Sequence, residues 1–126
     1  MASILVVDDG KDVRLALAAL LEDAGHKVLE AKDGSEVMGM TLTGQPDLIL
    51  LDIVMPQMDG FETLRRLKAD PRTYGVPVVM VTARSRGKDV ALARALGACD
   101  YINKPWADGE VELRVNWALT SRRQSA

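Results

Sequence analysis

Acidic, hydroxyl, aromatic and basic side chains follow apolar, strand-like runs at five places along this chain. These places are Asp8-Asp9, Asp52, Thr82, Tyr101 and Lys104-Pro105. If the apolar runs are parallel strands of one sheet, these side chains emerge at its carboxyl edge, where open α/β sheets bind their ligands. Three carboxylates, one lysine and one threonine at that edge predict a site for a divalent cation and a phosphoryl group.

The acids carry the strongest signal. Asp8 and Asp9 end the first apolar run, and Asp52 lies near the end of the most hydrophobic run. Three carboxylates brought together repel one another, so at least one pKa should rise unless a cation is bound. Taken alone, Asp8-Asp9 is explained as a helix N-cap, because a helix is expected directly after it. The third acid favours a site for Mg²⁺, which binds carboxylates, water and phosphate oxygens.

The other three residues are ambiguous one by one. Taken alone, Lys104 is explained as a solvated surface lysine. However, Pro105 restricts the Lys104 backbone to extended conformations and so directs its side chain. Thr82 fits a strand residue whose hydroxyl bonds to the backbone, and Tyr101 fits a half-buried core position. Their meaning depends on the elements that bring them together.

Length and composition indicate one globular domain. The 126 residues are enough to bury a core without disulfides, and the single cysteine, Cys99, cannot form one internally. A net charge of −2 offers no broad basic field, so direct binding to nucleic acid is not expected. The start of the chain lacks the pattern of a signal peptide, and no apolar run approaches the ~20 residues of a membrane span. We therefore expect a cytoplasmic domain with no membrane contact.

Hydrophobic periodicity predicts five strands alternating with five helices. The expected strands are residues Ser3–Val7, Lys27–Ala31, 47–53, 76–81 and 99–102. The expected helices are residues 11–24, 35–42, 58 or 59–69, 89–96 and 107–121. This alternation implies right-handed βαβ crossovers and a single parallel sheet with helices on both faces. We assign residues 1–121 to the domain and residues 122–126 to a polar tail or the start of a linker.

Together these stretches resemble the receiver domain of two-component response regulators, of the chemotaxis (CheY-like) type. The matching segments are VVDD (6–9), LLDIVMPQMDG (50–60), VVMVTA (78–83) and GACDYINKP (97–105). Thirty residues separate Asp52 from Thr82 and twenty-two separate Thr82 from Lys104, which is similar to the family's spacing. The resemblance implies a flavodoxin-like (βα)5 fold with strand order 2-1-3-4-5.

The resemblance also implies a role for each site residue. Asp52 is expected to accept a phosphoryl group from a phosphohistidine, assisted by Mg²⁺ or, alternatively, Mn²⁺. Asp9, Asp52 and the backbone carbonyl of Val54 would ligate the metal, and Asp8 would act through a metal-bound water. Lys104 and Thr82 would contact the phosphoryl oxygens. The domain would then catalyse only its own phosphorylation and dephosphorylation, and is not expected to be an enzyme in the ordinary sense.

A switch and a docking surface follow from the same resemblance. Movement of Thr82 toward the phosphoryl group would let Tyr101 turn and would change the face formed by the fourth helix, fifth strand and fifth helix. On the first helix, Arg14, Leu15 and Ala18 fall outside the core stripe and are candidates for contact with the kinase. Implied partners are a sensor histidine kinase or phosphotransfer protein and a downstream protein or fused output domain, with the chain a monomer or a phosphorylation-dependent dimer.

The loop at residues 84–88 has two interpretations that we weigh equally. Gly87 and three basic residues weaken the start of the fourth helix, as a switch requires, or the segment is a solvated basic loop. Arg84 and Val54 also flank the route of water to the phosphoryl group and should affect its lifetime, in a direction the sequence does not give.

Four other classes fit the sequence less well. A dehalogenase-type phosphatase would need an acid where Val54 stands, and the acids Asp8-Asp9 would repel the phosphate of a flavodoxin's FMN. A P-loop protein would need GxxxxGK[ST], which does not occur. A receiver-like domain that is never phosphorylated is disfavoured because every expected catalytic residue is present.

Overall fold

The computed structural model describes residues 1–125, and the side chains of residues 1–121. Its strands are β1 (Ser3–Val7), β2 (Lys27–Ala31), β3 (Leu48–Leu51), β4 (Val78–Thr82) and β5 (Asp100–Asn103). Its helices are α1 (Lys11–Asp23), α2 (Val37–Gly44), α3 (Gly60–Ala69), α4 (Gly87–Ala95) and α5 (Glu110–Ser125), with a 3₁₀ turn, η1 (Gly34–Glu36), before α2.

The strands within the described chain form one parallel sheet in the order β2-β1-β3-β4-β5, which confirms the predicted fold and strand order. All four residues of β3 are buried, as expected of the most hydrophobic run at the centre of a doubly covered sheet. The more polar β2 lies at one edge, with Lys27 and Glu30 exposed. Hydrophobicity along the chain therefore tracks position in the sheet.

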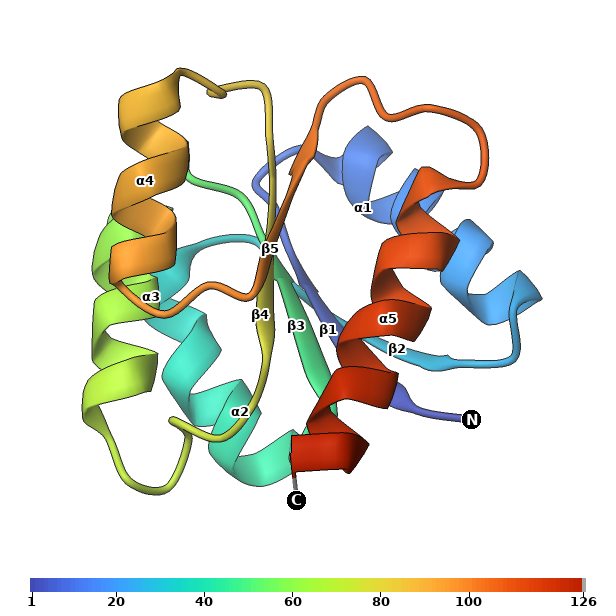
Figure 1. The fold of residues 1–126 in the computed structure, drawn as a ribbon, viewed down its shortest axis with the longest axis horizontal. Coiled ribbons are helices and arrows are strands. Elements are labelled where there is room, and N and C mark those ends of the chain that lie inside the picture. Colours follow the sequence, from blue (N-terminus) through green and yellow to red (C-terminus); the bar gives the residue numbers. More distant parts are fainter. Residues whose placement is uncertain (126) are drawn as a thin grey trace.

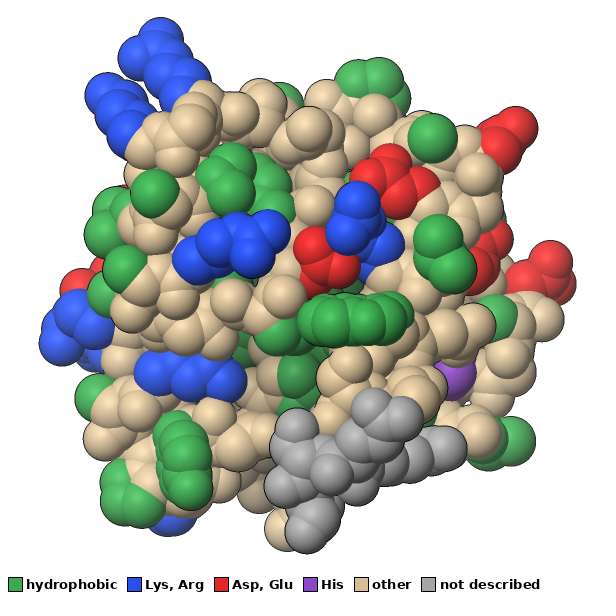
Figure 2. Space-filling view, in the orientation of Figure 1, with side chains coloured by type: hydrophobic (Ala, Val, Ile, Leu, Met, Phe, Trp, Pro, Cys, Tyr) green, Lys and Arg blue, Asp and Glu red, His purple; other side chains and the backbone are tan. Residues whose placement is uncertain are grey.

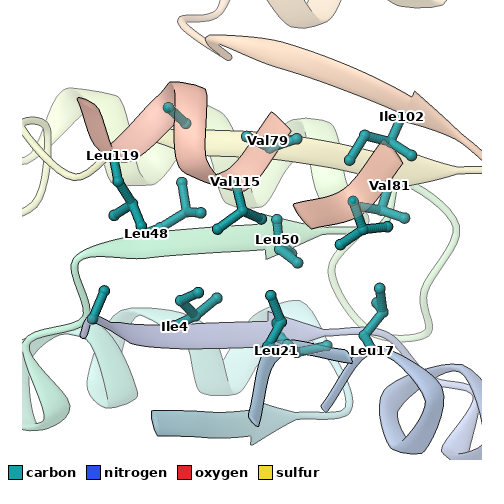
Figure 3. Close-up of a cluster of buried hydrophobic side chains, with 14 residues drawn as sticks. Ile4, Leu17, Leu21, Leu48, Leu50, Val79, Val81, Ile102, Val115 and Leu119 are labelled. Atoms are coloured by element: carbon teal, nitrogen blue, oxygen red, sulfur yellow. The ribbon is translucent and has the colours of Figure 1, made fainter. Parts of the chain in front are cut away.

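Helices cover both faces of the sheet (Figure 1). Helices α1 and α5 lie on one face, where they enclose the cluster drawn in Figure 3, which includes Leu17, Leu50 and Val115. Helices α2, α3 and α4 lie on the other face, over a second cluster that includes Ile49, Leu64 and Met80. Since helices cover both faces of the sheet, a ligand can reach the sheet only at the edge where the strands end.

Several helix starts differ from the sequence-based expectation. Helix α2 begins at Val37, after the 3₁₀ turn, and not at residue 35, and α3 begins at Gly60, one residue after the later of its two expected starts. Helix α5 begins at Glu110 rather than at residue 107, because Gly109 has φ 78° and the Glu110 side chain accepts a hydrogen bond from the Ala107 amide across the turn. Helix α4 begins at Gly87, two residues before the expected start. Helix α5 also continues to Ser125, so residue 121 does not mark a helix end, and Ala126 lies outside the described residues.

Within residues 1–125, no helix combines the length and apolar character that a bilayer crossing requires.

Candidate functional site

Three carboxylates meet at the carboxyl ends of the neighbouring strands β1 and β3. Asp8, Asp9 and Asp52 each offer an oxygen, and these oxygens lie within 4.8 Å of one another. The sheet itself brings them together, because the Asp52 amide donates to the Val7 carbonyl at 3.0 Å, directly beyond the last paired residues. Asp8 and Asp52 are buried while Asp9 is exposed, so the cluster opens to solvent on the Asp9 side.

The Asp52 carboxylate is held in a fixed orientation. Its Oδ1 accepts hydrogen bonds from the amide of Ile53 at 2.7 Å and, at a longer 3.4 Å, from that of Val54. Its Oδ2 accepts from the ammonium of Lys104 at 2.9 Å. Behind it, Gly60 at the start of α3 approaches so closely that a Cβ there would lie 2.2 Å from the Asp52 carbonyl oxygen. Two backbone amides and one ammonium therefore hold the carboxylate, while Gly60 packs against the backbone that carries it.

Lys104 joins two of the acids. Its Nζ lies 2.5 Å from Asp8 Oδ2 and 2.9 Å from Asp52 Oδ2, and its side chain is only 19% exposed. The Lys104 amide donates to the Thr82 carbonyl at 3.0 Å, which ties the loop to the end of β4, and the Lys104–Pro105 peptide is cis. The contacts of its Nζ with Asp8 and Asp52 show that the Lys104 side chain points into the cluster.

Burial and charge act in opposite directions on this group. Burial raises the pKa of Asp8, although Lys104 and the Gly10 amide lower it; the nearby Asp52 charge contributes less. Burial would lower the pKa of Lys104, but its hydrogen bonds to Asp8 and Asp52 outweigh this and raise it. A raised carboxyl pKa was expected from mutual repulsion of the acids; the structure shows it at Asp8, with burial as the larger cause.

Thr82 and Tyr101 are linked through the backbone of Arg84. Thr82, fully buried at the end of β4, accepts a hydrogen bond from the Arg84 amide at 3.2 Å through its Oγ1. Tyr101 is half-buried against the cluster beneath α2, α3 and α4, and its hydroxyl donates to the Arg84 carbonyl. Burial, with the nearby Asp89 charge, raises the pKa of Tyr101.

The exposure expected for the docking patch on α1 is only partly correct. Ala18 is buried, because it shares a helix face with Leu21, three residues on, and the buried stripe is wider than the periodicity suggested. The Arg14 side chain is only 16% exposed, since it bonds to the Asp8 carbonyl at 2.7 Å and to Glu30 at 3.2 Å. Leu15 is exposed as expected, at 53%.

Sequence reasoning missed the contacts of the Arg84 side chain. Its Nε lies 3.1 Å from Oδ1 of Asp89, and its guanidinium carbon lies 5.6 Å from the centre of the Phe61 ring. Asp89 is buried although it stands in the first turn of α4, where an exposed acid is common. The only sequence signal was an acid five residues after a basic residue, which is too frequent to be informative.

A metal ion fits the donor set of the cluster. Carboxylate oxygens are the ligands that Mg²⁺ prefers. Three of them, including one from the solvent-facing Asp9, lie within 4.8 Å of one another. Val54, two residues after Asp52, is exposed in the adjoining loop.

Comparison with known proteins agrees with this geometry. Residues 4–116 match the family described as the response regulator receiver domain. The chain is 40% identical to the protein PilH of Pseudomonas aeruginosa over 105 residues, which are 83% of this chain and 87% of PilH. It is 38% identical to the phosphate regulon transcriptional regulatory protein PhoB of the same organism over 117 residues, 93% of this chain and 51% of PhoB.

Solved structures give the same result. The chemotaxis protein CheY4 of Vibrio cholerae aligns with a TM-score of 0.88 at 28% identity, covering 94% of this chain and 98% of CheY4. A CheY-like receiver domain protein of Methanospirillum hungatei aligns with a TM-score of 0.93 at 25% identity, covering 100% of this chain and 99% of that one. The chain spans about half the length of PhoB and of several other curated relatives. On its sequence match, its fold and its strand order, the chain belongs to the response regulator receiver domain family.

Proposed function

We propose that this domain accepts a phosphoryl group on Asp52 and so acts as the phosphorylated switch of a two-component pathway. The observation that carries the proposal is the buried Asp52 carboxylate, fixed by the Ile53 amide and by Lys104 beside two further acids. A carboxylate is already ionised at neutral pH, so no general base has to activate it. The donor would be the phosphohistidine of a sensor kinase or phosphotransfer protein.

The reaction is a transfer between two nucleophiles. An Asp52 oxygen attacks phosphorus and forms the new P–O bond, while the P–N bond to the donor imidazole breaks and its electron pair stays on that nitrogen. Lys104 would neutralise charge on the phosphoryl oxygens, and its contact with Asp52 Oδ2 at 2.9 Å supports this role. Catalysis is then positioning and charge neutralisation, the general pattern of phosphoryl transfer.

Asp9, Asp52 and the Val54 carbonyl would hold Mg²⁺, with Asp8 acting through a bound water. When bound, the cation supplies positive charge beside the phosphoryl oxygens and offsets the repulsion among the three acids. Asp9, the exposed member, would leave the entry path open, whereas the buried Asp8 stays paired with Lys104. Mn²⁺ has similar ligand preferences and could substitute.

The signal would leave through Thr82 and Tyr101. A phosphoryl group adds about −1.5 to −2 charge at Asp52 and attracts the Thr82 hydroxyl. Tyr101 would respond and alter the face of α4, β5 and α5, which Figure 2 shows as hydrophobic side chains interspersed with charged ones. Exposed Leu92, Leu113 and Trp117 belong to these helices and are candidates for contact with a downstream protein, an output domain or a second receiver. The kinase would contact the side of the domain that carries Leu15. The domain would lie in the cytoplasm.

Acetyl phosphate with Mg²⁺ provides a direct test. The intact mass of the parent protein should increase by one phosphoryl group, and Asp52→Ala should abolish the increase because it removes the attacking oxygen. Asp23→Asn, which removes an exposed acid at the end of α1, should react like the parent. A parent protein that gains no mass, or an Asp52→Ala variant that gains it equally, would contradict the proposal.

A further inference from the structure

Arg84 occupies a junction that its place in an exposed loop does not suggest. Its backbone amide donates to Thr82 Oγ1 at 3.2 Å, and its backbone carbonyl accepts the Tyr101 hydroxyl. Both hydroxyl groups of the expected switch therefore contact one residue. The position of the Arg84 backbone determines whether these two contacts exist together.

The Arg84 side chain is anchored to two different helices. Its Nε contacts Asp89 of α4 at 3.1 Å, and its guanidinium lies over the ring of Phe61 of α3, 5.6 Å from the ring centre. Asp89 is 2% exposed, and its second oxygen, Oδ2, has no hydrogen-bond partner among the described residues. A buried carboxylate with one unpaired oxygen depends strongly on the cation that it retains.

The anchor restrains a segment that has little other support. Helix α4 starts at Gly87, and its N-cap residue, Arg86, makes no side-chain capping bond. Residues 83–88 are all exposed, so the buried Asp89 is the nearest residue after them in the sequence to which this loop can be anchored. An ion pair from Arg84 to Asp89 spans the whole unsupported turn.

We propose that Arg84 is a positioning residue of the switch. Its side chain, held between Asp89 and Phe61, fixes the loop so that its backbone amide orients the Thr82 hydroxyl and its backbone carbonyl retains the Tyr101 ring. With the Thr82 oxygen accepting from the Arg84 amide, the hydroxyl hydrogen is directed elsewhere and is available to an incoming phosphoryl oxygen. The proposal rests on the proposed function for its consequence, but the restraint on Tyr101 exists without phosphorylation.

Fluorine NMR of protein labelled with 3-fluorotyrosine tests the restraint directly. The chain has two tyrosines, and Tyr74, exposed in the loop after α3, serves as an internal reference. Without a phosphodonor, Arg84→Met should shift or broaden the Tyr101 resonance toward an exposed ring, since losing one hydrogen bond changes such an equilibrium roughly fivefold. Arg84→Lys should restore the parent signal, because its ammonium lies one atom beyond the position of Nε and can still reach Asp89.

Two controls separate this role from general destabilisation. Arg86→Met removes an exposed charge of the same sign from the same loop and should leave the Tyr101 resonance unchanged. If Arg84→Met does not fold, Asp89→Asn replaces it, because the amide preserves the side chain's shape and removes its charge; the same Tyr101 shift is expected. An unchanged Tyr101 resonance in the folded Arg84→Met or Asp89→Asn variant, or a failure of Arg84→Lys to restore it, overturns the proposal.

The phosphodonor then distinguishes the two proposals. If the parent protein gains no phosphoryl group, the proposed function fails, yet the comparison of Tyr101 resonances without donor still decides the role of Arg84. If the parent is phosphorylated, the donor-induced shift of Tyr101 should be smaller in Arg84→Met than in Arg84→Lys.

Discussion

One ammonium serves two buried carboxylates in this site. Lys104 contacts Asp8 and Asp52 at once, so a single side chain provides both carboxylates with the cation that burial requires. Asp9 is exposed and can rely on water. The acids are thus not equivalent at the level of single residues: two are stabilised by the protein, and the third faces the solvent from which a metal would arrive.

Replacing Lys104 by methionine should destabilise the metal-free protein. The substitution keeps most of the aliphatic chain but leaves Asp8 and Asp52 buried without a cation, which costs about 3–5 kcal/mol in a fully buried pair. Because the Lys104 side chain is 19% exposed, we expect a smaller loss of about 1–3 kcal/mol in the free energy of unfolding. Urea unfolding at neutral pH in EDTA measures it.

Lys88→Met is the matched control, because Lys88 is exposed in α4 and its loss should change the free energy of unfolding by at most about 0.5 kcal/mol. Equal stabilities of Lys104→Met and the parent would show that water, and not Lys104, compensates the two buried acids.

At the scale of elements, the sequence predicts what burial determines and misses what tertiary contacts determine. The limits of β1 and β2 were predicted correctly, and each strand ends where a charged residue, Asp8 or Lys32, follows it. The start of α5 was not, since it depends on the local turn at Gly109 and the Glu110 side chain. The burial of Ala18 and the reach of Arg84 to Asp89 depend on how neighbouring elements pack, which no local pattern encodes.

The same limit applies to the site. The acids, Thr82 and Lys104 could be placed at one edge from strand endings alone, but the strand order rested on family resemblance. Asp8 and Asp52 are buried and Asp9 is exposed, a difference that strand endings do not encode. Only the structure could supply that difference.

The start of α3 should be intolerant of any side chain at Gly60. A Cβ there would lie 2.2 Å from the Asp52 carbonyl oxygen and 2.7 Å from the Ile53 Cα, both rigid backbone atoms. Gly60→Ala must therefore displace α3 or the Asp52 segment, and we expect a loss of about 1–3 kcal/mol, typical of overpacking, together with slower phosphoryl uptake. Urea unfolding and timed mass spectrometry with acetyl phosphate measure the two effects.

The same change from glycine to alanine at Gly39 should have the opposite effect on stability. Gly39 is exposed within α2, and nothing lies within 4 Å of its would-be Cβ. Alanine should stabilise the protein there by about 0.5–1 kcal/mol, because it restricts the unfolded chain and favours the helix. If the two substitutions had equal effects, close approach at Gly60 would not be the cause.

At the scale of the whole molecule, the fold places its charge where a ligand can compensate it. Two hydrophobic clusters, one on each face of the sheet, provide the stability, while the carboxyl edge gathers three acids and one lysine. The edge therefore holds excess negative charge that the folded chain brings together and the unfolded chain disperses. A cation that binds this edge has to stabilise the whole domain.

Mg²⁺ should consequently raise the midpoint of thermal unfolding. A ligand that binds only the folded state stabilises it by RT ln(1 + [L]/Kd), which is about 2.7 kcal/mol when its concentration is 100 times Kd. The increase should saturate with MgCl₂ and should not appear with NaCl at equal ionic strength, since screening acts on exposed charges generally.

Asp9→Asn should weaken Mg²⁺ binding and shift the titration to higher concentration, because Asp9 is the exposed carboxylate of the cluster. Asp108→Asn, an exposed acid in the loop before α5, should leave the titration unchanged. Differential scanning calorimetry measures the unfolding midpoint of the parent and both variants over a MgCl₂ series, and of the parent in NaCl. An equal rise of the parent's midpoint in NaCl would contradict a specific metal site at this edge. So would an Asp9→Asn titration identical to that of the parent.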